Sequence, residues 1–327
     1  SIEIECEVGN IKRIRIKKYR IKLYHLKVYV INIEFINLIS IKKMETRNKG
    51  LLLSLLGVLI LSPDSLLIRL VNLDDFSLIF YRSIIPIISV IIFLIYYYKT
   101  SFFKSIILIG VPGIIYAILY AITHICFVYS IQHTSVANTL VLIAASPIFA
   151  AIFSIFLLNE KPNLFTWITI FLALLGVIII GWGSFTSTGL YGDIMALIMA
   201  SAMGLSMVIV RYYKEKDLIP ACLVGCAIAT IYALPFDINF NLNIFQISLL
   251  MLMGLIILPI PFMILTISPK YAPAHEVALI FLMESVLGTI WVWLVINEVP
   301  PLNTIIGGMI LLISVTIFIV KTTKFKN

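Results

Sequence analysis

Charged residues are scarce in this chain of 327 residues. Only 12% of the residues are charged, whereas 61% are hydrophobic, and the mean hydropathy is +1.09. A soluble domain carries about 25% charged residues, so this chain has too little polar surface to face water on all sides. The composition excludes an ordinary soluble protein and predicts an all-α integral membrane protein in contact with the lipid bilayer.

Residues that would indicate a metal site, a disulfide or a catalytic centre are also few. Among the four cysteines, Cys222 and Cys226 lie four residues apart in an apolar stretch, with no histidine to complete a zinc site. The chain contains no Walker A motif, and its short polar loops hold no nucleophile–base constellation. We therefore expect no disulfide, no metal, no cofactor and no enzymatic activity.

The net charge of +8 lies mostly at the N-terminus. Residues 1–49 hold 12 Lys or Arg and 5 Glu, so seven of the eight net positive charges lie there, and we expect no nucleic-acid partner. We interpret residues 1–49 as a basic leader, disordered or not native. In this interpretation residues 1–43 precede the natural start of translation, at Met44. The alternative is a cytoplasmic arm attracted to anionic lipid headgroups.

The remainder of the chain divides into apolar stretches, each with roughly the 17–25 residues that a bilayer requires. We expect ten transmembrane helices, at residues 50–70, 76–98, 105–129, 134–158, 164–183, 190–212, 218–236, 246–267, 274–296 and 302–320.

The loops between these spans alternate in charge. Lysine and arginine occur only in the loops on the N-terminal side, including Lys99, Lys161 and Lys214, and in the basic tail 321–327. The opposite loops carry Asp74, Asp237 and similar residues without any lysine or arginine. Because cytoplasmic loops are enriched in Lys and Arg, we expect a multi-pass protein of the inner (plasma) membrane with both termini in the cytoplasm.

One ten-residue stretch occurs twice. Residues 159–168 read NEKPNLFTWI and residues 297–306 read NEVPPLNTII, so six of ten positions are identical at an offset of 138. Each copy joins two spans, with proline in the turn. The repeat predicts two five-helix units, residues 50–183 and 190–320. Because each unit has an odd number of spans, the second is inverted, as in transporters that work by alternating access.

These features together resemble the EamA-type drug/metabolite transporter superfamily. The resemblance rests on two five-span halves, a Glu-x-Pro-like turn after spans four and nine, Gly192-Asp193 opening span six, and Arg82 within span two. It implies ten helices around a central cavity and movement of small organic metabolites across the inner membrane, often outward. The chain differs from the family late in span one, where Ser62-Pro63-Asp64 replaces the common Trp-Gly.

Charged residues inside the spans are the first candidates for a site, because each costs about 2.5–3.5 kcal/mol or more at a helix centre. Asp64 and Arg82 are each expected about 9 Å below the outer face of a hydrocarbon core roughly 30 Å thick. At equal depth the two side chains can form an ion pair or share an anionic substrate. A static structural pair and a functional site remain equal alternatives.

Glu284 is the candidate nearest the midplane, about 15 Å deep at ~1.5 Å per residue. It lies 138 residues after Ser146, so the two are expected to flank the cavity as a pseudo-symmetric pair. We expect no fixed cation beside this glutamate. Its charged form is then disfavoured by burial, which suits proton coupling or capture of a cationic group. The alternative is a structural glutamate satisfied by its neighbours.

An aromatic stripe provides further candidates. Tyr116, Tyr120 and His124 are spaced four residues apart in span three and therefore share one helix face. They can line the cavity and stack a planar solute, or they can simply pack. At the span ends, Glu160, Glu298 and Glu276 are candidate gate or turn residues, with an ordinary interfacial role as the alternative for Glu276.

The sequence thus predicts a secondary active transporter of small organic metabolites or drugs, proton-coupled or working as an exchanger, as a monomer or homodimer. The alternatives are a membrane-embedded structural or receptor protein and, less favoured, a membrane enzyme. Flux of a solute into reconstituted vesicles separates the transporter from both.

The loop charges predict a specific topology. Reporter fusions after Leu73 and Asp237 should read extracytoplasmic, whereas fusions after Lys99 and Lys214 should read cytoplasmic. A cytoplasmic reading after Asp237 would contradict the ten-span arrangement.

Overall fold

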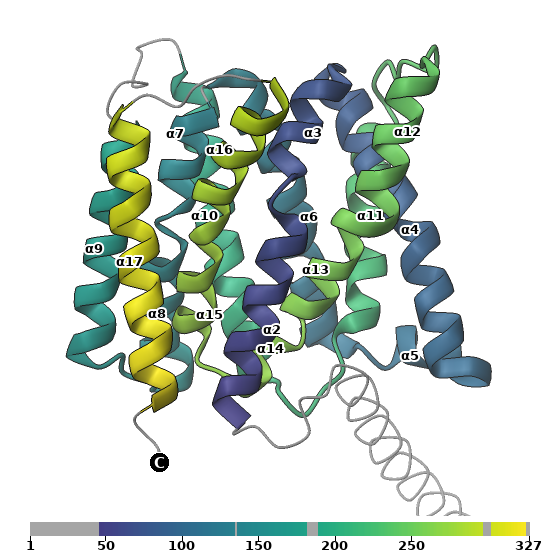
Figure 1. The fold of residues 1–327 in the computed structure, drawn as a ribbon. Coiled ribbons are helices and arrows are strands. Elements are labelled where there is room, and N and C mark those ends of the chain that lie inside the picture. Colours follow the sequence, from purple (N-terminus) through teal and green to yellow (C-terminus); the bar gives the residue numbers. More distant parts are fainter. Residues whose placement is uncertain (1–45, 135, 182–188, 297–301, 325–327) are drawn as a thin grey trace, which may run out of the picture. The chain divides into compact units, whose positions relative to one another are not determined.

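The computed structural model describes residues 46–324 apart from 135, 182–188 and 297–301 (Figure 1). All of them belong to one compact unit, Glu45–Asn327. Residues 1–45 of the expected leader, and Glu298, lie outside the described residues. Arg47 and Lys49, which we assigned to the leader, lie in the first turn of the first described helix.

The described residues form helices throughout. The first half contains α2 (Thr46–Leu61), α3 (Asp64–Val71), α4 (Asp75–Tyr98), the short 3₁₀-helix η1 (Lys99–Ser101), α5 (Phe102–Ile107), α6 (Gly110–His133), α7 (Val136–Ile143), α8 (Ser146–Leu158) and α9 (Leu164–Gly181). The second half contains α10 (Leu190–Tyr212), α11 (Ile219–Ala233), α12 (Ile244–Leu252), the π-helical turn η2 (Met253–Ile257), α13 (Pro259–Leu265), α14 (Ser268–Tyr271), α15 (Ala274–Phe281), α16 (Met283–Ile296) and α17 (Leu302–Lys324).

Six helical segments among the described residues are long and apolar enough to cross a membrane. They are Thr46–Val71, Asp75–Tyr98, Gly110–His133, Leu190–Tyr212, Ile244–Tyr271 and Ala274–Val295. Shorter apolar helices are Ser146–Leu158, Leu164–Gly176, Ile219–Ala233 and Ile305–Phe318. The prediction of a multi-pass, all-helical membrane protein is therefore confirmed. Some bounds differ from the expected ones: span three begins at Gly110 rather than at residue 105.

Spans one, four, eight and nine are each interrupted partway. Proline accounts for the first two breaks, since Pro63 separates α2 from α3, and Pro147, which has no N–H to donate, lies in the first turn of α8. Span eight passes through the π-helical turn before Pro259 and Pro261. The break in span nine, at Leu282, has no proline. It lies 138 residues after Ala144 in the break of span four, the same offset as the sequence repeat.

The helix contacts follow the same symmetry. Exchanging the halves maps span one onto six, two onto seven, three onto eight, four onto nine and five onto ten. The contacts of α4 with α11 and of α9 with α17 each map onto themselves. The contact of α6 with α10 maps onto that of α13 with α2, and both contacts are present. This packing fits a two-repeat architecture.

The two halves also run in opposite directions. Gln132, at the end of α6, donates a hydrogen bond to the carbonyl of Leu73, just after α3 (2.7 Å). Thr134, the residue after α6, donates to Asp193 in the first turn of α10 (2.7 Å). Span six therefore begins at the end of the bundle where span one finishes. In Figure 1, α2 begins and α17 ends at the opposite, lower end.

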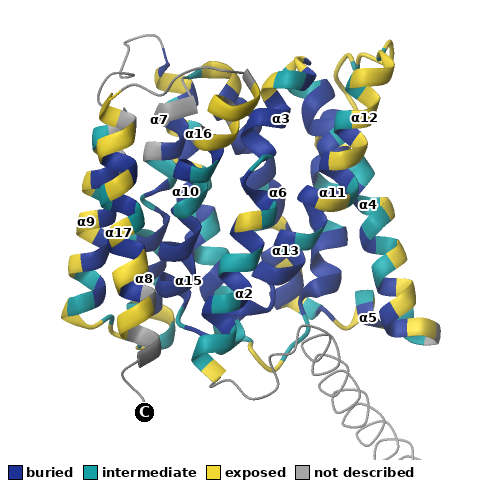
Figure 2. Ribbon diagram, in the orientation of Figure 1, coloured by how far each residue is buried: buried dark blue, intermediate teal, exposed yellow. Residues whose placement is uncertain are grey.

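The outer faces of the bundle are apolar. Ile92, Phe171, Ile231 and Leu294 each expose more than 60% of their surface, and Figure 2 shows exposed residues on the outward faces of α9, α17 and α4, around buried residues of α6, α11 and α13. Lipid is the solvent in which such a surface is stable. The helices are therefore arranged to place their polar side chains inward.

The close approach of α10 and α8 requires a glycine. A Cβ at Gly204 would lie 2.8 Å from the Ala150 nitrogen and 3.0 Å from the Ser146 carbonyl oxygen, both backbone atoms that cannot turn aside. Gly204→Ala should therefore lower stability by about 1–3 kcal/mol through overpacking, seen as a thermal midpoint several degrees lower in detergent. Gly57→Ala is the matched control, because its nearest neighbour would be Ile264 Cγ2 at 3.4 Å. Equal midpoints for the two variants would contradict the prediction.

Candidate functional site

A cavity lined by residues of both halves lies in the middle of the bundle. The space open to the centres of water molecules in this cavity is about 60 Å³. That volume holds roughly four waters. Six of the seven residues that the sequence singled out for substrate or coupling line it: Asp64, Arg82, Tyr116, Tyr120, His124 and Glu284. A metabolite larger than a few atoms requires the helices around it to move apart.

Asp64 and Arg82 form a bidentate ion pair in this wall. Arg82 Nη1 donates to Asp64 Oδ1 (2.6 Å) and Nη2 donates to Oδ2 (2.9 Å), and both residues are buried. Asp64 begins α3, so Pro63 and the helix break place its carboxylate at a helix N-terminus, where negative charge is favoured. The guanidinium also lies 5.5 Å from the ring centroid of Phe127. The ion pair expected from the sequence is therefore formed.

Glu284 lines the same cavity from the first turn of α16. We expected no cation near it, and that expectation was wrong: Arg82 is close enough to act on it electrostatically, together with Asp64. Because Asp64 and Arg82 largely cancel, the cavity carries one uncompensated negative charge whenever Glu284 is ionised. The arrangement suits a proton or another cation as the occupant of this carboxylate.

Aromatic rings form another part of the cavity wall. Tyr120 and His124 stack with their centroids 4.5 Å apart, and Phe262 of α13 packs on both, at 4.9 Å and 4.8 Å. Within the described part of the chain, neither buried ring nitrogen of His124 has a hydrogen-bond partner. Tyr116 continues the stripe, 6.4 Å from Tyr120. The wall offers flat apolar faces and one unsatisfied imidazole, a surface that a planar or amphipathic solute can use.

Ser146 lies in a second, smaller pocket that adjoins the first. This pocket has a volume of about 20 Å³ and shares Glu284, Leu140 and Ile143 with the main cavity. Ser146 begins α8 just as Glu284 lies in the first turn of α16, so the expected pseudo-symmetric pair does face one space. The hydroxyl of Ser146 is buried and has no hydrogen-bond partner among the described residues.

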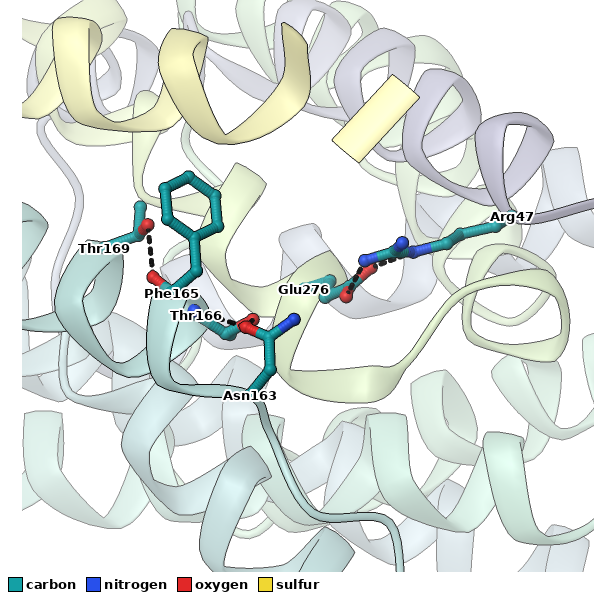
Figure 3. A network of polar contacts seen from close by, with 6 residues as sticks. All are labelled: Arg47, Asn163, Phe165, Thr166, Thr169 and Glu276. Atoms are coloured by element: carbon teal, nitrogen blue, oxygen red, sulfur yellow. Dashed lines mark hydrogen bonds and ion pairs between the residues drawn. The ribbon is translucent and has the colours of Figure 1, made fainter. Parts of the chain in front are cut away.

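The gate candidates that the structure describes pair with arginines across the two halves. Arg47 of α2 binds Glu276 of α15 through two hydrogen bonds, one of them from Nε to Oε2 at 2.9 Å (Figure 3). Arg211 of α10 binds Glu160, after α8, at 2.9 Å. Both ion pairs lie at the end of the bundle where α2 begins. They hold the first half against the second at that end.

The repeated turn forms as its sequence indicated. Asn159 ends α8 in the left-handed conformation (φ 55°), and Asn163 accepts hydrogen bonds from the backbone N–H (2.7 Å) and hydroxyl of Thr166 at the start of α9 (Figure 3). The second copy, residues 297–301, lies outside the described part of the chain.

Sequence reasoning missed three aromatic residues of the cavity, Phe127, Phe262 and Phe281. Phe127 follows His124 by three residues on α6, so the helical spacing of the stripe could have indicated it. Phe262 has no such signal, because span eight is apolar on every side and its inward face is set by packing alone.

Comparison with known proteins places this geometry in context. The EamA-like transporter family matches the chain twice, over residues 48–182 and 190–320. The pseudopaline exporter CntI of Pseudomonas aeruginosa is 26% identical over 214 residues, covering 63% of this chain and 74% of that protein. The uncharacterized transporter YdfC of Bacillus subtilis is 26% identical over 216 residues, covering 64% and 70%. One solved crystal structure agrees with a TM-score of 0.72 at 15% identity, covering 85% of this chain and 99% of the other, and shows the fold alone.

The buried ion pair can be tested by removing one charge or both. Asp64→Asn leaves Arg82 buried without its counter-charge, which typically costs 3–5 kcal/mol. The single variant should accumulate poorly and unfold at a much lower temperature in detergent. The double variant Asp64→Asn/Arg82→Gln removes both charges and should recover most of that loss. A double variant no more stable than the single one would show that the two charges do not depend on each other.

Proposed function

The chain belongs to the EamA-like transporter family, and we propose that it is a secondary active transporter that moves small organic metabolites across the cytoplasmic membrane by alternating access. The observation that carries the proposal is a central cavity between two inverted halves that contains a carboxylate, an ion pair and an aromatic wall. Transporters built from inverted repeats bind their substrates at the repeat interface near the midplane.

The proposed topology has ten spans, formed by the six long apolar segments and the four shorter ones. The repeats are residues 50–183 and 190–320. Both termini lie in the cytoplasm, because the lysine-bearing loops share the end of the bundle where α2 begins. The relatives from bacteria support a location in the inner membrane.

The cavity favours a solute with a cationic group and a flat or apolar body. The Asp64–Arg82 pair is internally neutralised, so an anion gains little from Arg82. Glu284 supplies the remaining charge, to which an ammonium group or a proton binds. The rings of Tyr120, His124 and Phe262 pack against the body of the solute, and aromatic faces also attract cations.

In an alternating-access mechanism, the two ion pairs that join the first half to the second form one gate. Arg47–Glu276 and Arg211–Glu160 close the bundle at the end that the topology makes cytoplasmic. Opening that end requires both pairs to part, and each half then moves as a unit about the broken spans. The broken helices beside the cavity supply the hinges, since their interrupted hydrogen-bond ladders bend at low cost.

The direction of transport and the ion or solute that drives it are determined by flux measurements. One relative is named as an exporter, which supports outward movement here. Purified protein in vesicles should be screened for flux of amino acids, vitamins, nucleotide-like cofactors and cationic drugs, with a proton gradient imposed and with unlabelled solute on the opposite side. Flux with either driving force supports the transporter, whereas solute binding without flux would support a receptor and chemical conversion an enzyme.

Glu284→Gln tests the coupling role within that screen. The amide keeps the volume of the side chain and removes the ionisable group, so accumulation driven by a proton gradient should fall to the level of empty vesicles while the thermal midpoint stays nearly unchanged. Glu215→Gln is the matched control, because Glu215 lies exposed in the loop after α10. The Glu215→Gln variant should transport normally. Normal transport by Glu284→Gln at every pH would make Glu284 a structural residue.

A further inference from the structure

The small pocket beside Ser146 has a composition that the proposed transport mechanism does not explain. It lies where the breaks of spans four and nine meet, and its lining includes Ile143, Ala144, Ser146, Phe281, Glu284 and Ser285. Its volume of about 20 Å³ accommodates one water-sized particle.

The break in span four releases backbone carbonyl oxygens at this pocket. Pro147 has no N–H, so the carbonyl of Ile143 lacks the donor that an unbroken helix provides four residues later. The N–H of Ile148 donates to Ala145 (3.0 Å) instead of to Ala144. Two successive carbonyls are therefore without their regular helical donors.

The break in span nine does the same from the opposite side. The N–H of Ser285 donates to Leu282 (3.2 Å), one residue later than the helical pattern requires, so Phe281 loses its regular donor. The hydroxyl of Ser285 donates to the same Leu282 carbonyl (2.7 Å).

Ser146 is a second observation that points to a ligand, because its unpartnered hydroxyl, unlike that of Ser154, belongs to a residue that lines this pocket. Its hydroxyl oxygen is 1% exposed as a residue and has no hydrogen-bond partner, although buried hydroxyls are nearly always paired. Glu284 adds a carboxylate. The pocket thus gathers three kinds of oxygen acceptor in a space that holds a single small particle: the Glu284 carboxylate, the Ser146 hydroxyl and the released carbonyls.

We propose that this pocket binds one sodium ion, held by Glu284, the Ser146 hydroxyl and the carbonyls released at the two helix breaks. Hard cations take oxygen ligands, and unwound backbone carbonyls at broken membrane helices are suited to coordinate sodium. The ion neutralises Glu284 without a proton. The site differs in kind from one built of three or more His, Cys, Asp or Glu, which is absent from the described residues.

Sodium bound here links the ion to the gate of the proposed transporter. The pocket exists only while the breaks of span four, in the first half, and span nine, in the second, face each other. The ion therefore stabilises one arrangement of the two halves over the other, which is the differential binding that coupling requires. This inference rests on the proposed function for its role in transport, but sodium binding itself does not.

The test measures sodium binding directly on the purified full chain in detergent. Thermal midpoints are recorded as sodium chloride replaces choline chloride at constant ionic strength and pH, and radioactive sodium is counted by equilibrium dialysis. A saturable rise in midpoint with about one sodium bound per chain is expected, because a ligand that binds only the folded state stabilises it. No rise relative to choline, together with no bound sodium, overturns the proposal.

Variants locate the ion. Ser146→Ala removes one oxygen ligand and should weaken the sodium dependence at least about tenfold, as expected for a lost bond to a charged group. Glu284→Gln should abolish it. Ser154→Ala is the matched control, since Ser154 lies two turns further along α8, is equally buried and unpartnered, and is not among the residues that line the pocket. An equal effect of the two serine variants contradicts the assignment.

Flux measurements separate this inference from the proposed function. Transport that follows a proton gradient while sodium neither binds nor stabilises leaves the transporter standing and removes the sodium site. Sodium binding with the expected variant pattern, in vesicles that move none of the screened solutes, supports the site and counts against the transporter.

Discussion

The ion pair between Asp64 and Arg82 is the interaction on which the centre of this protein depends. A single charge is costly in the middle of a bilayer, and here two buried charges satisfy each other through a bidentate contact. The pair joins α3 to α4 and removes both charges from competition for a solute. Glu284 is thereby left as the uncompensated charge of the cavity, although it lies within the electrostatic reach of both partners.

Helix breaks explain how polar groups come to lie at this depth. Asp64 begins α3, Ser146 begins α8 and Glu284 lies in the first turn of α16. Each thus sits where a span is interrupted and backbone groups are released from the helical ladder. In a bilayer such irregular backbone is tolerated only where it faces protein or a cavity. The same constraint therefore creates the cavity and places the side chains that line it.

The two ends of the bundle differ in how the halves are held together. At the end where α2 begins, two arginine–glutamate pairs cross from one half to the other. At the opposite end, Thr134 and Asp193 form a neutral-to-charged hydrogen bond between α6 and α10. The symmetry of the helix contacts means that a rearrangement at one end has a counterpart at the other. Two similar units in opposite orientations can thus exchange conformations.

The sequence by itself determined the membrane class, the approximate spans, the repeat and the set of polar candidates, because hydropathy, a fixed offset and charges within apolar runs are all local signals. Tertiary structure alone decided which candidates meet. It placed Arg82 within reach of Glu284, brought Phe262 onto His124, and broke span nine at Leu282 without a proline. Helices that are apolar on every side carry no mark of their inward face, so the rotation that joins these residues follows from packing between helices.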